Sequence, residues 1–176
     1  MTRDELFYLA PYLISFLIIL GVFIYTLRHM QVRGAAVYLW FVGGQTLTDF
    51  GFIFELVTPS LEIKILWDMF QWITDTVVIV AFFLFATEFT EKKFKHPRLV
   101  WGLLLILPAM LIGMLLTDSI HHQLYPNPHL RASYPFQVLE YDFTTFVYIY
   151  ALAFVYFVPI YGAGLLIRRA FSARGP

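Results

Sequence analysis

Three carboxylates stand inside apolar stretches that are long enough to cross a membrane. Asp49 lies within the stretch from Ala35 to Leu56, and Asp68 and Asp75 lie within the stretch from Leu61 to Phe89. A charged side chain in hydrocarbon costs at least ~2.5–3.5 kcal/mol, so such groups normally face the interior of a helix bundle or a water-filled cavity. The three aspartates therefore predict a functional cavity within the membrane.

Helical spacing places these acids on two polar stripes. Over 61–89, intervals of four, three and four residues align Lys64, Asp68, a glutamine and Asp75 on one face of a helix. Because Lys64 precedes Asp68 by one turn, it is expected to neutralise that carboxylate in part. A second stripe lies on the preceding stretch and is expected to face the first across a short turn. The predicted ligand-binding residues on and beside the two stripes are Gln45, Asp49, Asp68, Gln71, Trp72 and Asp75.

A second interpretation of the stripes is packing. Polar side chains in membrane bundles also join helices by hydrogen bonds, at ~0.6 kcal/mol per contact. This interpretation suits Gln45 and Gln71 better than the aspartates, because such contacts do not require ionisable groups. Trp72 could stack on a ligand, but aromatic residues near an interface are usually belt or packing residues, and this role is favoured.

Composition identifies the class of protein. Hydrophobic residues make up 60% of the chain and charged residues only 14%, whereas a soluble domain has ~45–50% apolar residues. Five stretches reach the ~20 apolar residues of a membrane-spanning helix, and the run from Val77 to Phe85 lacks the alternation of a barrel strand. We therefore predict one all-α integral membrane domain over 1–176. It is a bundle of five helices at about 6–27, 35–56, 61–89, 99–116 and 143–167, with a loop at 117–142.

The distribution of cations predicts the orientation. Nine of the twelve Lys and Arg residues follow the first, third and fifth apolar stretches. Loops rich in Lys and Arg stay in the cytoplasm. We therefore expect a multi-pass protein of the cell membrane with its N-terminus and the 117–142 loop outside and its C-terminus inside.

The loop at 117–142 offers a possible metal site. Its residues Asp118, His121, His122 and His129 are of types that bind Zn²⁺ or Cu²⁺. Adjacent histidines tend to point apart, however, and the prolines break any regular spacing, so we predict solvated histidines and no metal, with metal binding kept as the alternative. Alternating apolar residues at 138–141 predict a short hairpin that covers the cavity.

Several classes of function are excluded by what the sequence lacks. It has no cysteine, and no P-loop, GxGxxG or HExxH motif, so none of the common soluble catalytic signatures is present. Net charge is zero, which gives no general attraction to nucleic acid. A retinal protein would need a lysine in a late span, and the fifth stretch has none. Haem between helices would need histidines within the membrane, and all five histidines lie at helix ends or in loops. We expect no cofactor and no enzymatic activity.

Markers along residues 35–150 carry a resemblance to a known family. A tryptophan opens the second helix and a glutamate ends it. A glutamine–aromatic pair lies in the third helix, which closes with a glutamate–aromatic–threonine triplet. In these features the chain resembles the seven-helix sensor region at the N-terminus of many bacterial and archaeal histidine kinases and of some diguanylate cyclases. The residues at these places are Trp40, Glu55, Gln71, Trp72, Glu88, Phe89 and Thr90.

The resemblance implies the sensory input domain of a signalling receptor. Such a sensor has seven helices and a cytoplasmic output module, whereas five spans and a short tail are expected here, so we expect a truncated sensor or a natural five-helix relative. The expected site is an outward cavity between the second, third and fifth helices that binds a small, partly apolar ligand. The expected partners are the lipid bilayer and a cytoplasmic signalling module. The alternative is a structural subunit of a larger membrane complex.

Overall fold

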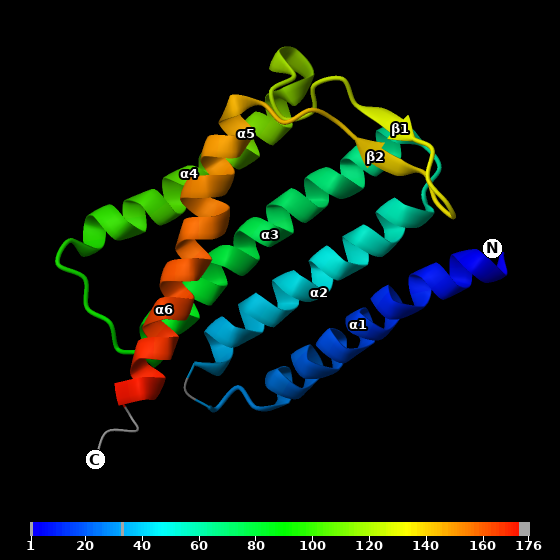
Figure 1. Ribbon diagram of the computed structural model, residues 1–176. Coiled ribbons are helices and arrows are strands. Elements are labelled where there is room, and N and C mark those ends of the chain that lie inside the picture. Colours follow the sequence, from blue (N-terminus) through cyan, green and yellow to red (C-terminus); the bar gives the residue numbers. More distant parts are fainter. Residues whose placement is uncertain (1, 33, 173–176) are drawn as a thin grey trace.

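The computed structural model describes residues 2–32 and 34–172. Its elements form a chain of long helices interrupted by one small hairpin (Figure 1). The last three helical elements run on without a break, and the middle one of them, η1, is a π-helix. In order, the elements are α1 (Arg3–Arg28), α2 (Ala35–Val57), α3 (Leu61–Phe89), α4 (Pro97–His121), β1 (His129–Arg131), β2 (Val138–Glu140), α5 (Thr145–Tyr150), η1 (Ala151–Tyr156) and α6 (Phe157–Ser172).

Local sequence signals set several helix ends. Thr2 and Glu5 form a capping box at the start of α1, in which each side chain accepts a hydrogen bond from the other residue's backbone N–H. Gly34 precedes α2 with φ of 83°, a left-handed conformation that glycine adopts without strain. Pro97 stands at the start of α4, where its missing N–H leaves no helical hydrogen bond unmade.

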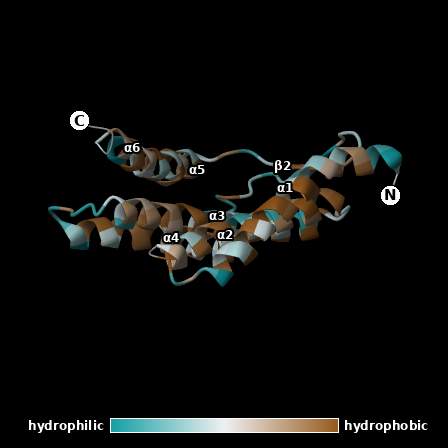
Figure 2. Ribbon diagram, turned by 90° about the horizontal axis from the view of Figure 1, so that it is seen from below, coloured by the Kyte–Doolittle hydropathy of each residue, from teal (hydrophilic) through white to brown (hydrophobic). Residues whose placement is uncertain are grey.

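The helices pack in chain order and then return to α3. α1, α2 and α3 lie side by side, with α2 between the other two, and α6 crosses the face of α3 (Figure 1). Figure 2 shows α5 and α6 as a layer separate from α2 and α3. A core of apolar side chains joins α3, α4 and the last helix; among its members are Ile79, Phe83, Leu111, Leu115, Tyr150 and Phe154.

Within the described residues, four helices are long and apolar enough to cross a membrane: α1, α3, α4 and the continuous helix Thr145–Ser172. Apolar colour runs along the helices in Figure 2, and many large apolar side chains face outward, as expected of surfaces in contact with lipid. The all-α, multi-pass membrane class is thereby supported. The predicted span at 35–56 is a helix of 23 residues, but its run of Gly43 to Asp49 makes it less apolar, and it packs between α1 and α3.

Some boundaries differ from the prediction. The fourth helix extends to 97–121 instead of 99–116, because Thr117 and Asp118 continue the helix despite their polarity. The hairpin predicted at 138–141 is confirmed: β1 and β2 are antiparallel, with Leu130 opposite Leu139. The hairpin lies against the N-terminal end of α1, where the Tyr134 hydroxyl donates to the Asp4 carboxylate.

The two ends of the bundle differ in charge. The start of α1, the α2–α3 turn and the hairpin lie at one end (Figure 1). The α1–α2 and α3–α4 connections and the end of α6 lie at the other, together with most of the cations. Of the nine cations that predicted the cytoplasmic side, Arg33 and Arg174 lie outside the described residues. The described part of the chain therefore groups the remaining seven at a single end.

Candidate functional site

One carboxylate oxygen attaches the loop between α4 and α5 to the bundle. Asp68 of α3 accepts hydrogen bonds on Oδ2 from the Tyr125 hydroxyl at 2.7 Å, the Tyr141 hydroxyl at 3.0 Å and the Trp72 indole N–H at 3.1 Å. Tyr125 lies in the loop after α4, and Tyr141 directly follows β2. We call these four residues the Asp68 cluster. The cluster attaches two separate parts of the 122–144 segment to the same point of α3.

The two tyrosines are suited to act as donors. Burial raises the pKa of Tyr125 and of Tyr141, and the nearby Asp68 carboxylate raises both further. A raised pKa keeps each hydroxyl protonated throughout the physiological range. Both hydroxyls therefore remain hydrogen-bond donors to Asp68.

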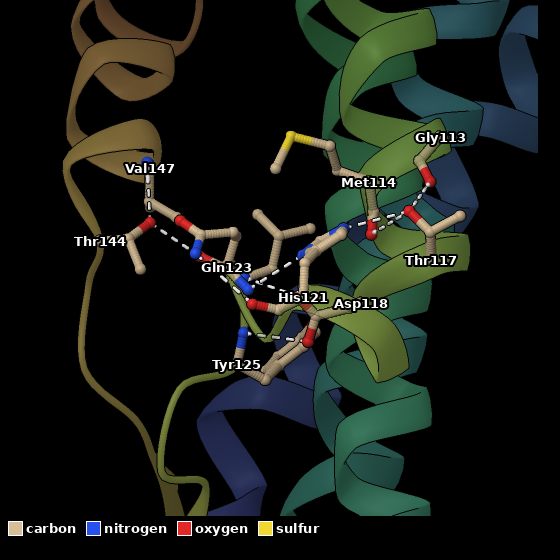
Figure 3. Close-up of polar contacts among 10 residues, drawn as sticks. Gly113, Met114, Thr117, Asp118, His121, Gln123, Tyr125, Thr144 and Val147 are labelled. Atoms are coloured by element: carbon tan, nitrogen blue, oxygen red, sulfur yellow. Dashed lines mark hydrogen bonds and ion pairs between the residues drawn. The ribbon is translucent and has the colours of Figure 1, made fainter.

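A second aspartate shapes the loop that carries Tyr125. The buried Asp118 side chain accepts from the backbone N–H of Leu124 at 2.8 Å and of Tyr125 at 3.3 Å. Thr144 fixes the other end of the segment, since it donates to the Gln123 carbonyl at 2.7 Å and caps α5 (Figure 3). The loop between α4 and α5 is thus held by side-chain contacts to its backbone.

The loop histidines do not gather. The His121 ring contacts Thr117 and the Gln123 backbone N–H (Figure 3), and the His129 ring contacts the Asn127 carbonyl. Within residues 2–32 and 34–172, no three His, Cys, Asp or Glu side chains are grouped as metal ligands. Asp118, considered above as a metal ligand, instead binds backbone N–H groups.

A cavity of about 390 Å³ adjoins the Asp68 cluster, three of whose residues line it. Its volume falls within the ~300–1,000 Å³ of small-molecule sites. One wall is α3, the other is α5 and η1, and Tyr141 closes part of it. We call it the α3–η1 cavity. Its lining residues are Asp68, Gln71, Trp72, Asp75, Thr76, Ile79, Tyr141, Phe143, Val147, Tyr148, Tyr150, Ala151, Val155 and Tyr156.

The predicted site residues fall into two groups. Asp68, Gln71, Trp72 and Asp75 line the α3–η1 cavity. Gln45 and Asp49 line no part of it; they bond to each other at 2.9 Å, and Asp49 also accepts from Ser15 of α1 at 3.4 Å. The expected cavity between the second, third and fifth helices therefore has no lining from α2.

Thr48 connects the two groups. Its hydroxyl lies 2.9 Å from Oδ1 of Asp75, to which it donates, and 2.8 Å from the Thr74 hydroxyl. The polar stripe of α2 thus contacts Asp75 across the α2–α3 interface, and it does not line the cavity. This part of the stripe fits the packing interpretation.

Lys64 does not neutralise Asp68 as expected. Its ammonium group donates to the backbone carbonyls of Glu55 and Leu56, at the C-terminal end of α2. Gln71 in turn donates to the Glu55 carboxylate at 2.7 Å. The prediction was wrong because helical spacing only aligns Lys64 with Asp68 on one face of α3. It does not show that the carbonyls at the end of α2 compete for the same ammonium group.

Three of the seven residues that carried the resemblance lie apart from one another. Glu55 is buried at the C-terminal end of α2. Trp40 is exposed and borders an apolar groove with α1. Glu88 is exposed near the C-terminal end of α3. None of them lines the α3–η1 cavity.

Sequence reasoning missed Tyr125, which donates to Asp68 without lining the cavity, and the lining residues Tyr141 and Tyr150. Tyr125 and Tyr141 come from a loop whose path no periodicity describes, and Tyr150 comes from the last helix, whose aromatic residues surround it on all sides. The available signal was that Asp68, an acid within an apolar stretch, needs hydrogen-bond donors, and that tyrosines such as Tyr125 and Tyr141 in the 117–142 loop can supply them.

Comparison with known proteins gives one match. The model of a family described as the N-terminal 7TM region of histidine kinase matches residues 11–176. This range is wider than the 35–150 over which the sequence markers were recognised. No curated protein and no solved structure matches the chain.

Proposed function

The chain belongs to the family of N-terminal 7TM regions of histidine kinases, and from this premise we propose that it binds a small, partly apolar ligand in the α3–η1 cavity. Such a region is a membrane sensory input domain rather than a catalytic module. The proposed partners are the lipid bilayer and a cytoplasmic signalling module or other membrane subunits that respond to the ligand.

The observation that carries this proposal is the position of Asp75. It stands at the midpoint of α3, its side chain is exposed, and it lines a cavity otherwise formed largely by aromatic and apolar groups. An ionisable group at mid-membrane is expensive and is usually retained for binding or transport. A few polar groups in a mostly apolar pocket are typical of a small-molecule site.

The π-helix offers a route from the cavity to the other end of the bundle. Ala151, Val155 and Tyr156 of η1 line the cavity, and η1 continues directly into α6. Single π-helical turns inside α-helices occur often at functional sites. α6 rests closely on α3, since a Cβ at Gly162 would lie 3.0 Å from the Phe82 ring. A ligand that changes the η1 wall would therefore shift α6 against α3.

A binding test follows from the cavity wall. Ala151→Trp places an indole in the α3–η1 cavity, whereas Leu152→Trp replaces an outward-facing neighbour and serves as the matched control. In a thermal-stability screen of small molecules against the full chain, we expect stabilising compounds to lose their effect with Ala151→Trp and keep it with Leu152→Trp. Compounds that stabilise both variants equally would refute a site in this cavity. A chain that serves only as a packing subunit would give no stabilising compound.

The orientation is proposed from the cations: the hairpin end faces outward and the Lys92 to Arg98 end faces the cytoplasm. The chain has no cysteine, so single cysteines at Ser119 and Lys93, both exposed, report the side directly. We expect an impermeant maleimide added to intact cells to label Ser119→Cys and to leave Lys93→Cys unlabelled until the cells are lysed. Labelling of Lys93→Cys in intact cells would reverse the orientation.

A further inference from the structure

We propose that the ligand of the α3–η1 cavity is a small organic cation, an ammonium group carried on a short apolar body. The inference rests on the proposed function, because it names the chemistry of the ligand for the same cavity. It is drawn from the charges of the cavity lining and from the aromatic rings that stand beside Asp75.

The lining carries two carboxyl groups without a positive partner. Asp68 and Asp75 both line the cavity. Among the described residues, no Lys, Arg or His nitrogen lies within 4.0 Å of either carboxylate; the ion pairs found there involve other acids. Lys64, the cation on the same face of α3, donates to the end of α2 instead. A cationic ligand would supply the missing charge.

The two carboxylates have different roles. Oδ2 of Asp68 already accepts three hydrogen bonds from protein donors. Asp75 accepts one, from Thr48 on the side away from the cavity lining, and its side chain is exposed. Seven residues separate the two along α3, a rise of roughly 10 Å. Asp75 is therefore the anchor for an incoming ammonium group, and Asp68 holds the outer wall.

Aromatic rings stand at the level of Asp75. Trp72 precedes it by three residues and so shares its face of α3. The Tyr150 ring lies 6.4 Å from the Trp72 ring, and its hydroxyl is 3.3 Å from the Thr76 hydroxyl, next to Asp75 in sequence. Tyr148 and Tyr156 complete the aromatic lining. Tryptophan and tyrosine faces attract ammonium groups, most strongly where water is excluded.

Other ligand classes fit less well. An anion would meet two carboxylates and no lysine, arginine or histidine among the lining residues. A metal ion would require several ligands, and the described residues group no three of the usual types. A neutral apolar molecule would leave Asp75 without a partner on its cavity side. The combination of one accessible carboxylate with Trp and Tyr rings selects an organic cation.

Pairs of isosteres test the charge directly. Choline and 3,3-dimethylbutan-1-ol have nearly the same shape and differ in charge. Phenethylammonium and 2-phenylethanol form a second such pair, in which an ammonium group replaces a hydroxyl. Each is titrated calorimetrically against the full chain in an uncharged maltoside detergent. We expect at least one cation to bind about tenfold or more tightly than its neutral partner, a difference that a carboxylate with aromatic neighbours can supply. This comparison uses the unmodified chain and does not depend on how a variant folds.

Variants then locate the effect. Asp75→Asn should abolish the preference for the cation, while Asp49→Asn, which removes a charge outside the cavity lining, should preserve it. Equal binding of cation and neutral isostere, lost in Ala151→Trp, would overturn the cation inference and leave the proposed ligand site intact. Binding of neither member of either pair would overturn both. Retention of the full preference in Asp75→Asn would also overturn the inference, because a group other than Asp75 would then bind the ligand's ammonium.

Discussion

Replacing Lys64 with methionine is expected to lower the free energy of unfolding by about 3–5 kcal/mol. The Lys64 side chain is only 1% exposed and donates to the Glu55 and Leu56 carbonyls at the end of α2. Carbonyls at a helix C-terminus lack partners within the helix and carry partial negative charge, which a cation stabilises. Methionine conserves much of the volume, so the loss reports the ammonium contacts rather than a new cavity.

The loss should extend to the neighbouring acid. The Glu55 carboxylate is buried, interacts electrostatically with Lys64 and accepts from Gln71. Without the ammonium group the buried Glu55 carboxyl would keep one amide donor, from Gln71. Lys93→Met, at an exposed lysine, is the matched control and should change stability by less than about 0.5 kcal/mol. Unfolding in mixed detergent micelles measures both. Equal stability of the two variants would show that Lys64 does not cap α2.

The helices themselves were predictable because membranes impose a simple rule. Backbone groups in hydrocarbon must be satisfied within the segment, so a long apolar run has few options besides a helix. The run at 61–89 matches α3 without error. The polar ends were less predictable: Thr117 and Asp118 belong to α4 because a helix can continue past the apolar region once its own hydrogen bonds are made.

The face of α3 was predictable, but its neighbours were not. Helical spacing alone places Asp68 and Asp75 on one stripe, and both line the same cavity. The cavity was assigned to the second, third and fifth helices; the fifth, as α5 and η1, does form the wall opposite α3, whereas α2 lines none of it. A short turn guarantees that two helices are adjacent, but it does not say which of their faces meet. That depends on packing among helices far apart in the chain.

The partners of Lys64 and Asp68 show the same limit. Both residues were correctly selected as unusual within an apolar stretch, and an electrostatic pair one turn apart is a reasonable local expectation. Each instead finds partners supplied by tertiary structure: a helix end for Lys64, and loop tyrosines for Asp68. Buried polar groups take whichever arrangement satisfies most of them, and several donors from other elements satisfy Asp68 better than one lysine would.

Asp68→Leu is expected to destabilise the chain by about 3 kcal/mol or more. It leaves the Tyr125 and Tyr141 hydroxyls without their acceptor and removes one of the two acceptors of the Trp72 indole N–H, which also donates to the Tyr141 hydroxyl. Each buried unsatisfied donor costs about 1–3 kcal/mol. Glu62→Leu changes an exposed acid near the start of the same helix and should have little effect. Hydrogen exchange should also increase across the hairpin, because the Asp68 cluster attaches that segment to α3.

Removing the donors distinguishes unsatisfied groups from lost packing. When both sides of a buried hydrogen bond become apolar, the net change can be nearly neutral. The variant that combines Asp68→Leu with Tyr125→Phe, Tyr141→Phe and Trp72→Phe removes all three donors, including the Trp72 N–H that also donates to the Tyr141 hydroxyl. It should therefore recover most of the stability lost by Asp68→Leu alone, although four residues have been changed. Hydrogen exchange in the hairpin should stay fast, because no hydrogen bond then ties the loop to α3. If the combined variant is less stable than Asp68→Leu, the tyrosine hydroxyls have other partners and the cluster does not depend on Asp68.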